Sequence, residues 1–239
     1  MPAYVSDIWV YLSANPLLWL TATMVAYVVG HWIFVRCGQN PLLNPVATAV
    51  VLLIAVLWAT GTDYRSYFDG AQFVHFMLGP AVVALGVPLY EHLAEVRKTL
   101  FPMACALLAG VVTAIVSVVA IAMILGASNE TVASLAPKSV TSPIAMGIAS
   151  EIGGLPSLTA GFVIITGILG AMIATPLFNA LGFTDWRARG FGIGIAAHGI
   201  GTARAFQVNE LAGTFAAIAM GLNGVATAVL VPLLVGLLL

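Results

Sequence analysis

Residues suited to binding a small anion gather in the stretch 136–159, which lies between two long apolar runs. Lys138 offers a positive charge, and three hydroxyl groups follow it, on Ser139, Thr141 and Ser142. Prolines interrupt the stretch, and each removes a backbone donor, so at membrane depth protein or a water-filled cavity has to satisfy the broken backbone. A helix starting here would also point free N–H groups at an anion. The stretch therefore predicts a carboxylate site, unless Lys138 reaches the interface and the hydroxyls only cap a broken helix.

A second polar group lies in the glycine-rich segment 188–206. Arg204 can hold a carboxylate with two parallel hydrogen bonds, and Thr202 can add a third. His198 is a candidate for carrying a coupled proton, because the ordinary pKa of histidine lies near physiological pH. In the alternative interpretation, Arg204 anchors a helix end at the interface, His198 bonds to backbone, and Thr202 bonds within its own helix.

Two further polar residues lie within or next to apolar segments. Glu151 is a second candidate for proton coupling or for pairing with Lys138, and it is equally well placed to be an interfacial loop residue. Asn223 lies inside the last apolar run, where an amide is typical of contacts between helices. The sequence carries no hydrolase, zinc-protease or nucleotide-binding signature, so we expect no enzyme, no cofactor and no metal site.

Composition indicates a membrane protein. Of the 239 residues, 61% are hydrophobic and 7% charged, with a mean hydropathy of +1.07. Soluble domains carry about 25% charged residues, and long apolar runs are typical of membrane-spanning helices. The fold class predicted is therefore all-α, a polytopic helical membrane protein in contact with lipid. The net charge of −1 and the lack of a basic patch argue against nucleic acid as a partner.

Eight apolar segments follow one another along the chain. Their predicted bounds are 16–35, 42–60, 71–92, 100–126, 136–152, 157–181, 188–206 and 212–239. The third, fifth and seventh are rich in glycine or proline, which lets helices break or pack closely. Residues 1–15 are predicted to form an interfacial helix. They lack the basic start of a signal peptide, and we also expect no transit peptide.

Basic residues suggest an orientation for these segments. Arg36, Arg97 and Arg187 fall on the same side of the membrane only if one segment enters and leaves on that same side. The broken segment 136–152 is the obvious candidate, which leaves about seven spans plus one re-entrant segment. The three segments within 42–126 and the three within 157–239 then cross the membrane in opposite directions. In each set the middle segment is interrupted by glycine or proline, and the first and third are uniformly apolar. This pattern predicts a 3+3 inverted repeat within a single transmembrane domain, 1–239, with the site near the midplane.

Several runs of this chain resemble the LrgB/CidB family. They are PKSVTSPIA (137–145), IGGLPSLTA (152–160), TGILGA (166–171), AAHGIGTARAF (196–206) and LGPAVVALGVPLY (78–90). Members of that family are described as holin-like partners of LrgA/CidA proteins in control of murein hydrolases and autolysis, and plant relatives as plastidal glycolate/glycerate translocators. Other members are linked to pyruvate movement. The segment 146–151 departs from some members because it has no early glutamate.

The residues and the resemblance together imply a secondary transporter of small 2-hydroxy or 2-oxo monocarboxylates, with proton coupling as an option. The resemblance also implies the alternative, a holin-like or antiholin-like regulator acting with an LrgA/CidA-like small membrane protein, or a scaffold for that protein. The chain is short for a solitary carrier, so we expect a homodimer. The expected location is a bacterial inner membrane.

Overall fold

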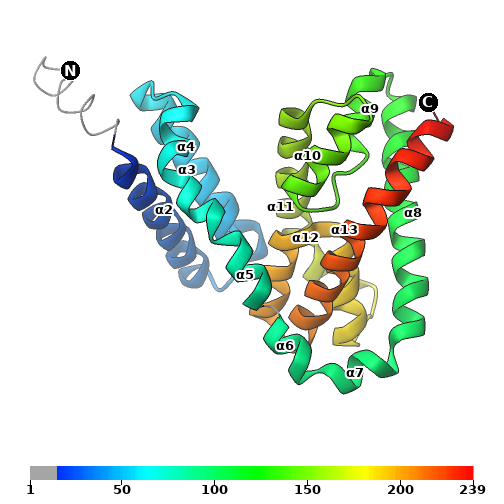
Figure 1. Ribbon diagram of the computed structural model, residues 1–239. Helices are drawn as coiled ribbons and strands as arrows, with labels where there is room; N and C mark the ends of the chain where they lie inside the picture. The colour runs from blue at the N-terminus through cyan, green and yellow to red at the C-terminus, as the bar shows by residue number, and fades with distance from the viewer. Residues whose placement is uncertain (1–14, 85, 239) are drawn as a thin grey trace, which may run out of the picture. The chain divides into compact units, whose positions relative to one another are not determined.

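The computed structural model describes residues 15–84 and 86–238, and these form helices joined by short loops, with no strand among them (Figure 1). The interfacial helix predicted for residues 1–15 falls almost wholly outside the described residues. Contacts group the chain into two compact units, Met1–Ala84 and Leu85–Leu239, which are described separately here.

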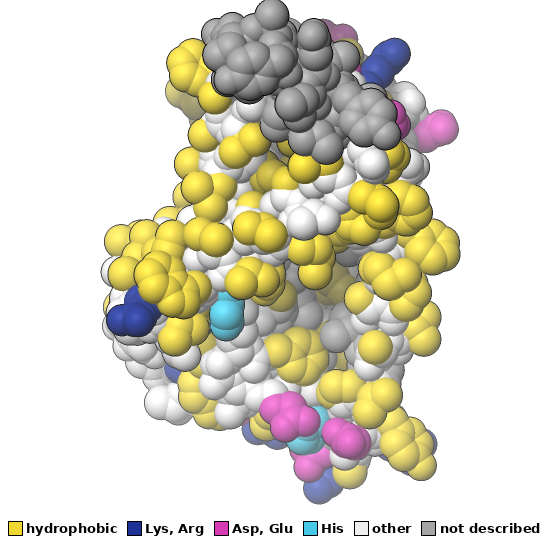
Figure 2. All heavy atoms as spheres, turned by 90° about the vertical axis from the view of Figure 1, so that its left-hand side faces the viewer, with side chains coloured by type: hydrophobic (Ala, Val, Ile, Leu, Met, Phe, Trp, Pro, Cys, Tyr) yellow, Lys and Arg dark blue, Asp and Glu magenta, His cyan; other side chains and the backbone are white. Residues whose placement is uncertain are grey.

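Unit 1 is built around the helix α2 (Pro16–Arg36), which packs against α3 (Pro45–Thr60) and α4 (Tyr64–Phe76). The remaining elements of this unit are η1 (Pro41–Leu43) and α5 (Leu78–Ala84). Asn15 caps α2 and Asn44 caps α3, each directly before a proline at the first helical position, so the sequence sets both starts. Large apolar side chains are exposed on these helices, Trp58 at 87% and Ile54 at 60%, and hydrophobic side chains are spread over the face that Figure 2 shows.

Unit 2 contains eight helices in its described part. They are α6 (Gly86–Glu91), α7 (Leu93–Lys98), α8 (Leu100–Ile124), α9 (Asn129–Leu135), α10 (Ser142–Glu151), α11 (Pro156–Ala180), α12 (Trp186–Val208) and α13 (Glu210–Leu238). The predicted segment 71–92 is not one helix: it is divided among α4, α5 and α6.

Four of the described helices are long and apolar enough to cross a membrane: α2, α8, α11 and α13. The helix α3 is apolar but shorter. An all-α, multi-pass membrane protein is thus confirmed. The inverted repeat of 42–126 and 157–239 remains a prediction.

The helices α8 and α13 run in the same direction. Met103, near the start of α8, packs in one cluster with Phe215 near the start of α13. Val119, near the end of α8, packs in another cluster with Val231 near the end of α13. The ends of α8 and α13 therefore mark two ends of unit 2, which we call the starting end and the finishing end.

Two shorter pieces enter unit 2 from these opposite ends. Val132 of α9 and Ile148 of α10 join the cluster at the finishing end, and the loop 136–141 connects the two helices. Ser134 Oγ accepts a hydrogen bond of 2.8 Å from the backbone N–H of Leu155, which brings the start of α11 back to α9. Over 129–155 the chain thus enters unit 2 and turns back toward the same end, and we call it a re-entrant piece of the unit. That 136–152 enters and leaves a membrane on one side remains a prediction.

The helix α12 also turns back on itself. At His198 the backbone angles are φ 38° and ψ −135°, which interrupt the helix. Before this break, a Cβ on Gly190 would meet the backbone of Ala212, and one on Gly194 would meet the backbone of Ala216. The first arm, 186–197, therefore runs parallel to the start of α13. Because only Asn209 separates α12 from α13, the second arm, 199–208, has to run back to the starting end.

This reversal changes one expectation from the sequence. Segment 188–206 was counted among the predicted spans, and in the alternative interpretation Arg204 anchored its end at the interface. In the structure Arg204 lies on the returning arm, near the start of α13, because the break at His198 reverses the chain. Unit 2 is therefore three long helices, α8, α11 and α13, with one re-entrant piece from each end.

Candidate functional site

The re-entrant piece 129–155 turns back at the loop 136–141, between α9 and α10, and we call this loop the first tip. The backbone N–H of Lys138 donates to the carbonyl of Leu135 at 3.1 Å, and that of Val140 to the carbonyl of Pro137 at 3.3 Å. Val140 is fully buried and packs with Ala145 and Val163. The turn is thus fixed by its own backbone and one apolar anchor, and it leaves Lys138 half-buried, with Nζ 3.4 Å from Ser139 Oγ.

The second tip is the break in α12 at His198 together with the turn before it, residues 195–198. The ring Nε2 of His198 lies 2.9 Å from the backbone carbonyl of Val163 on α11. Thr202 Oγ1 donates to the carbonyl of His198 at 2.8 Å and so satisfies the first turn of the returning arm. Gly167 makes room for the ring, because a Cβ there would lie 2.6 Å from Cε1 of His198. Both polar side chains therefore stabilise the break directly.

One residue of α13 contacts both tips. Asn223 Nδ2 donates to the carbonyl of Ser139 at 3.0 Å and to the carbonyl of Ile195 at 3.0 Å. Its Oδ1 accepts a hydrogen bond of 3.1 Å from Thr227 Oγ1. The two re-entrant pieces therefore meet beside the middle of α13.

Two cavities meet at Lys138. The larger, about 780 Å³, lies between α8 and the first arm of α12, and the smaller, about 450 Å³, lies between that arm and α11. Lys138, Gly192 and Ala196 line both. Ser139 lines the larger cavity only. Most of the other lining residues are apolar, so Lys138 supplies the positive charge at the inner end of both spaces.

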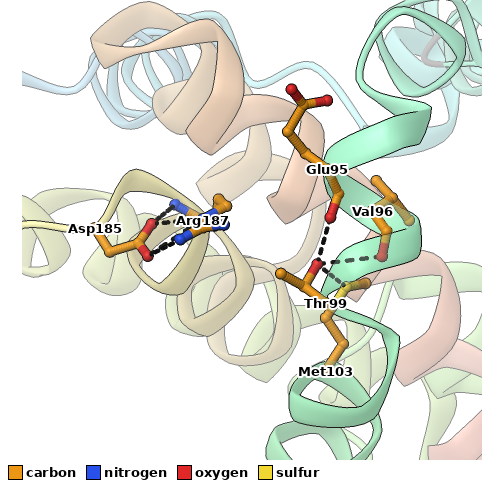
Figure 3. Close-up of polar contacts among 6 residues, drawn as sticks. All are labelled: Glu95, Val96, Thr99, Met103, Asp185 and Arg187. Carbon is orange, nitrogen blue, oxygen red and sulfur yellow. Dashed lines mark hydrogen bonds and ion pairs between the residues drawn. The ribbon is translucent and has the colours of Figure 1, made fainter.

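The larger cavity reaches the starting end of unit 2 between Thr99 and the Asp185–Arg187 pair, which face each other across the view in Figure 3. Arg187 Nη2 lies 2.6 Å from Asp185 Oδ2, and both side chains are partly exposed. The Arg187 guanidinium lowers the pKa of Asp185 by hydrogen bonding to it. Thr99 Oγ1 donates to the carbonyl of Glu95 at 2.9 Å and so closes the turn between α7 and α8.

The predicted site residues fall into two groups. Lys138 and Ser139 line a cavity, whereas Thr141, Ser142, His198, Thr202, Arg204 and Glu151 are not among the lining residues of either. Thr141 precedes α10 at its N-cap, and Glu151 ends that helix with an exposed side chain. Arg204 is buried, and its Nη1 donates to Gln207 Oε1 at 3.3 Å.

Sequence reasoning did not single out Thr99 or Arg187 as residues of a cavity mouth. Arg187 was noted only as a basic residue after an apolar run, and Thr99 not at all. Asn223 was interpreted as a contact between helices, and its hydrogen bond to Ile195 of α12 confirms this. Its second bond, to the loop carbonyl of Ser139, was not predicted. A lone amide in an apolar run was its only signal.

Comparison with known proteins places the chain among membrane proteins of one family. The family model described as the LrgB-like family matches residues 23–237. A relative named "Holin-like protein CidB" from Staphylococcus epidermidis is 35% identical over 94% of this chain and 97% of its own. A Bacillus subtilis protein named "Uncharacterized protein YxaC" is 34% identical over 90% of this chain and 93% of its own. The "Holin-like protein CidB" of Staphylococcus aureus is 31% identical over 82% of this chain and 86% of its own. No solved structure matches the chain.

Proposed function

The chain belongs to the LrgB-like family, and from this premise and the geometry of unit 2 we propose that it carries small 2-hydroxy or 2-oxo monocarboxylates across the membrane. The observation that carries the proposal is the position of Lys138, at the tip of one re-entrant piece and at the inner end of two cavities. A charged side chain at such a depth costs free energy, and proteins keep such groups where an ion or substrate visits. Glycolate, glycerate, lactate and pyruvate are the substrates proposed.

The arrangement of backbone supports a carrier. Irregular backbone at membrane depth is tolerated where it lies within protein or lines a cavity, and carriers place their sites where such broken segments meet. Here Asn223 contacts both the loop 136–141 and the first arm of α12 one turn before the break at His198. Lys138 and Ser139 would bind the carboxylate directly, by charge and hydrogen bond. Thr141, Ser142, Thr202 and Arg204 would contribute only after a rearrangement of the tips, with His198 or Glu151 as the group that takes a coupled proton.

The names of the relatives support a second function more directly than they support a carrier. Two of the three relatives reported above are named holin-like. In this second proposal the chain regulates murein hydrolase export and autolysis together with an LrgA/CidA-like small membrane protein, and it has no dedicated substrate. Both proposals place the chain in a bacterial inner membrane, as a homodimer, and neither includes a catalytic step.

Uptake into liposomes separates the two proposals. The purified protein is reconstituted, and uptake of labelled glycolate and pyruvate is followed with and without a pH gradient. The carrier predicts saturable, stereoselective uptake. Lys138→Ala should raise the KM at least about tenfold, because a hydrogen bond to a charged group contributes about 1.5–3 kcal/mol. Lys98→Ala is the matched control, since Lys98 is exposed at the end of α7 and lines neither cavity.

Absence of uptake under every gradient, with and without an LrgA-like partner, would reject the carrier and leave the holin-like function. Uptake that Lys138→Ala does not change would place the anion elsewhere. Arg204→Ala belongs in the same series, because it tests whether the returning arm of α12 takes part.

A further inference from the structure

The amide of Asn223 is the one group among the described residues that donates hydrogen bonds to both tips. Its two hydrogens go to the carbonyl of Ser139 and the carbonyl of Ile195, each at 3.0 Å. The side chain is only 1% exposed, so both bonds are shielded from bulk solvent. The Ser139 carbonyl lies next to Lys138 in sequence, and the Ile195 carbonyl lies one turn before the break at His198.

Chemistry fixes the orientation of this amide. Both tip carbonyls are acceptors, so only the NH₂ end can face them. Thr227 Oγ1 lies 3.1 Å from the remaining oxygen and donates to it, which leaves each polar atom of the Asn223 side chain with a partner. Asparagine therefore matches this place closely. Aspartate, in either protonation state, offers at most one hydrogen to two carbonyls, and leucine offers none.

We propose that Asn223 is a positioning residue that joins the tips of the two re-entrant pieces and thereby holds Lys138 at the junction of the two cavities. The inference rests on the proposed anion site at Lys138. The bridge acts through backbone carbonyls, so the anion does not have to touch Asn223. The bridge fixes the position of the two re-entrant pieces relative to each other, although they enter unit 2 from opposite ends.

The variants that test this bridge change the number of hydrogen-bond donors at position 223 while keeping the side chain close to its original size. Asn223→Leu removes both donors, and Asn223→Asp retains at most one. Thr214→Val is the matched control, because Thr214 lies on the same helix, is equally buried, and donates its hydroxyl to the carbonyl of Glu210 and not to Asn223. Asn223→Asp also serves if Asn223→Leu does not yield folded protein.

Hydrogen–deuterium exchange measures the bridge without any substrate. We expect peptides covering 136–141 and 195–200 to exchange at least about tenfold faster in Asn223→Leu than in wild type, because the two bonds lost are each worth a few-fold to about tenfold in local opening. Thr214→Val should leave both peptides near the wild-type rate. Unchanged exchange at either tip in Asn223→Leu and Asn223→Asp would overturn the bridge.

Two readouts then test positioning as opposed to stability alone. In a background of Cys37→Ser and Cys105→Ser, a Lys138→Cys thiol should react faster with a charged thiol reagent when Asn223→Leu is added. In the liposome assay, the Asn223 variants should raise the KM for the carboxylate more than they lower the maximal rate. Faster exchange with unchanged labelling at position 138 and unchanged KM would overturn the positioning role. If wild type shows no uptake, the proposed function fails, while exchange and labelling still decide the bridge.

Discussion

Gly167 on α11 offers a sharp test of the contact between that helix and the break in α12. In Gly167→Ala the new Cβ would lie 2.6 Å from Cε1 and 2.7 Å from Nε2 of His198, where ordinary contacts begin at 3.4 Å. The ring would have to retreat by nearly 1 Å. That movement would stretch its 2.9 Å contact with the Val163 carbonyl beyond hydrogen-bond length.

The expected cost follows from these distances. If the ring stays in place, the overpacked contact lowers the free energy of unfolding by about 1–3 kcal/mol. If the ring moves, its buried nitrogen loses its hydrogen bond, which lowers the free energy of unfolding by a similar amount, about 1–3 kcal/mol. The two costs are alternatives because the movement relieves the clash. Gly161→Ala is the matched control: it lies on the same helix, and nothing lies within 4 Å of its added Cβ. Both variants gain the same helix propensity, about 1 kcal/mol, which cancels in the comparison.

Thermal unfolding of the two purified variants, followed by circular dichroism in one detergent, measures the difference. A gap of about 1–3 kcal/mol corresponds to roughly 2–12 °C for a chain of this size, with Gly167→Ala the less stable. Uptake should also fall in Gly167→Ala and stay unchanged in Gly161→Ala. Equal unfolding temperatures would refute the packing of His198 against α11.

Three further outcomes are expected. Ser134→Ala should destabilise the protein by about 0.5–1.5 kcal/mol, since the N–H of Leu155 loses its hydrogen bond to the buried Ser134 hydroxyl. The exposed Ser150→Ala should not, and thermal unfolding compares the two variants. Asp185→Asn should cost less than about 1 kcal/mol, because the pair is partly exposed. Since Arg187 lowers the pKa of Asp185, this stabilisation is present above the ordinary carboxyl pKa and is lost as the pH falls through the lowered value, so unfolding scans of both proteins should converge in acid. A thiol at the cavity-lining Ala188, in a background without other cysteines, should react with an impermeant reagent from one side of the membrane only; reaction from both sides would contradict the cavity as described.

Local sequence was sufficient to predict the first tip. Pro137 and Pro143 cannot donate from their backbone nitrogens, so a continuous helix through 136–143 was excluded, and the structure has the loop 136–141 there. The same reasoning predicted Lys138 on broken backbone, and Lys138 lies in that loop, whereas its depth in a membrane remains a prediction. The long helices α8, α11 and α13 also begin and end within a few residues of the predicted apolar segments.

The second tip could not be predicted in the same way. Glycines in 188–206 indicated close packing, but the reversal occurs at His198, a residue other than glycine with φ 38°. Such a conformation is unusual for a side-chain-bearing residue, and here contacts from α11 and α13 support it. Those contacts come from distant parts of the chain. The contacts of Asn223 could not be predicted either, because its partners are backbone carbonyls 84 and 28 residues away in the sequence.

Protection of the tip by substrate is the most direct test of the proposed anion site. In a background of Cys37→Ser and Cys105→Ser, a Ser139→Cys thiol at the inner end of the larger cavity is labelled with a charged reagent in the presence of rising pyruvate, glycolate or lactate. The proposal predicts that at least one of these acids slows labelling in a saturable way and that chloride at equal ionic strength does not. A labelling rate that stays the same with every acid, in protein that remains folded, would contradict a carboxylate site at Lys138 and favour the holin-like function.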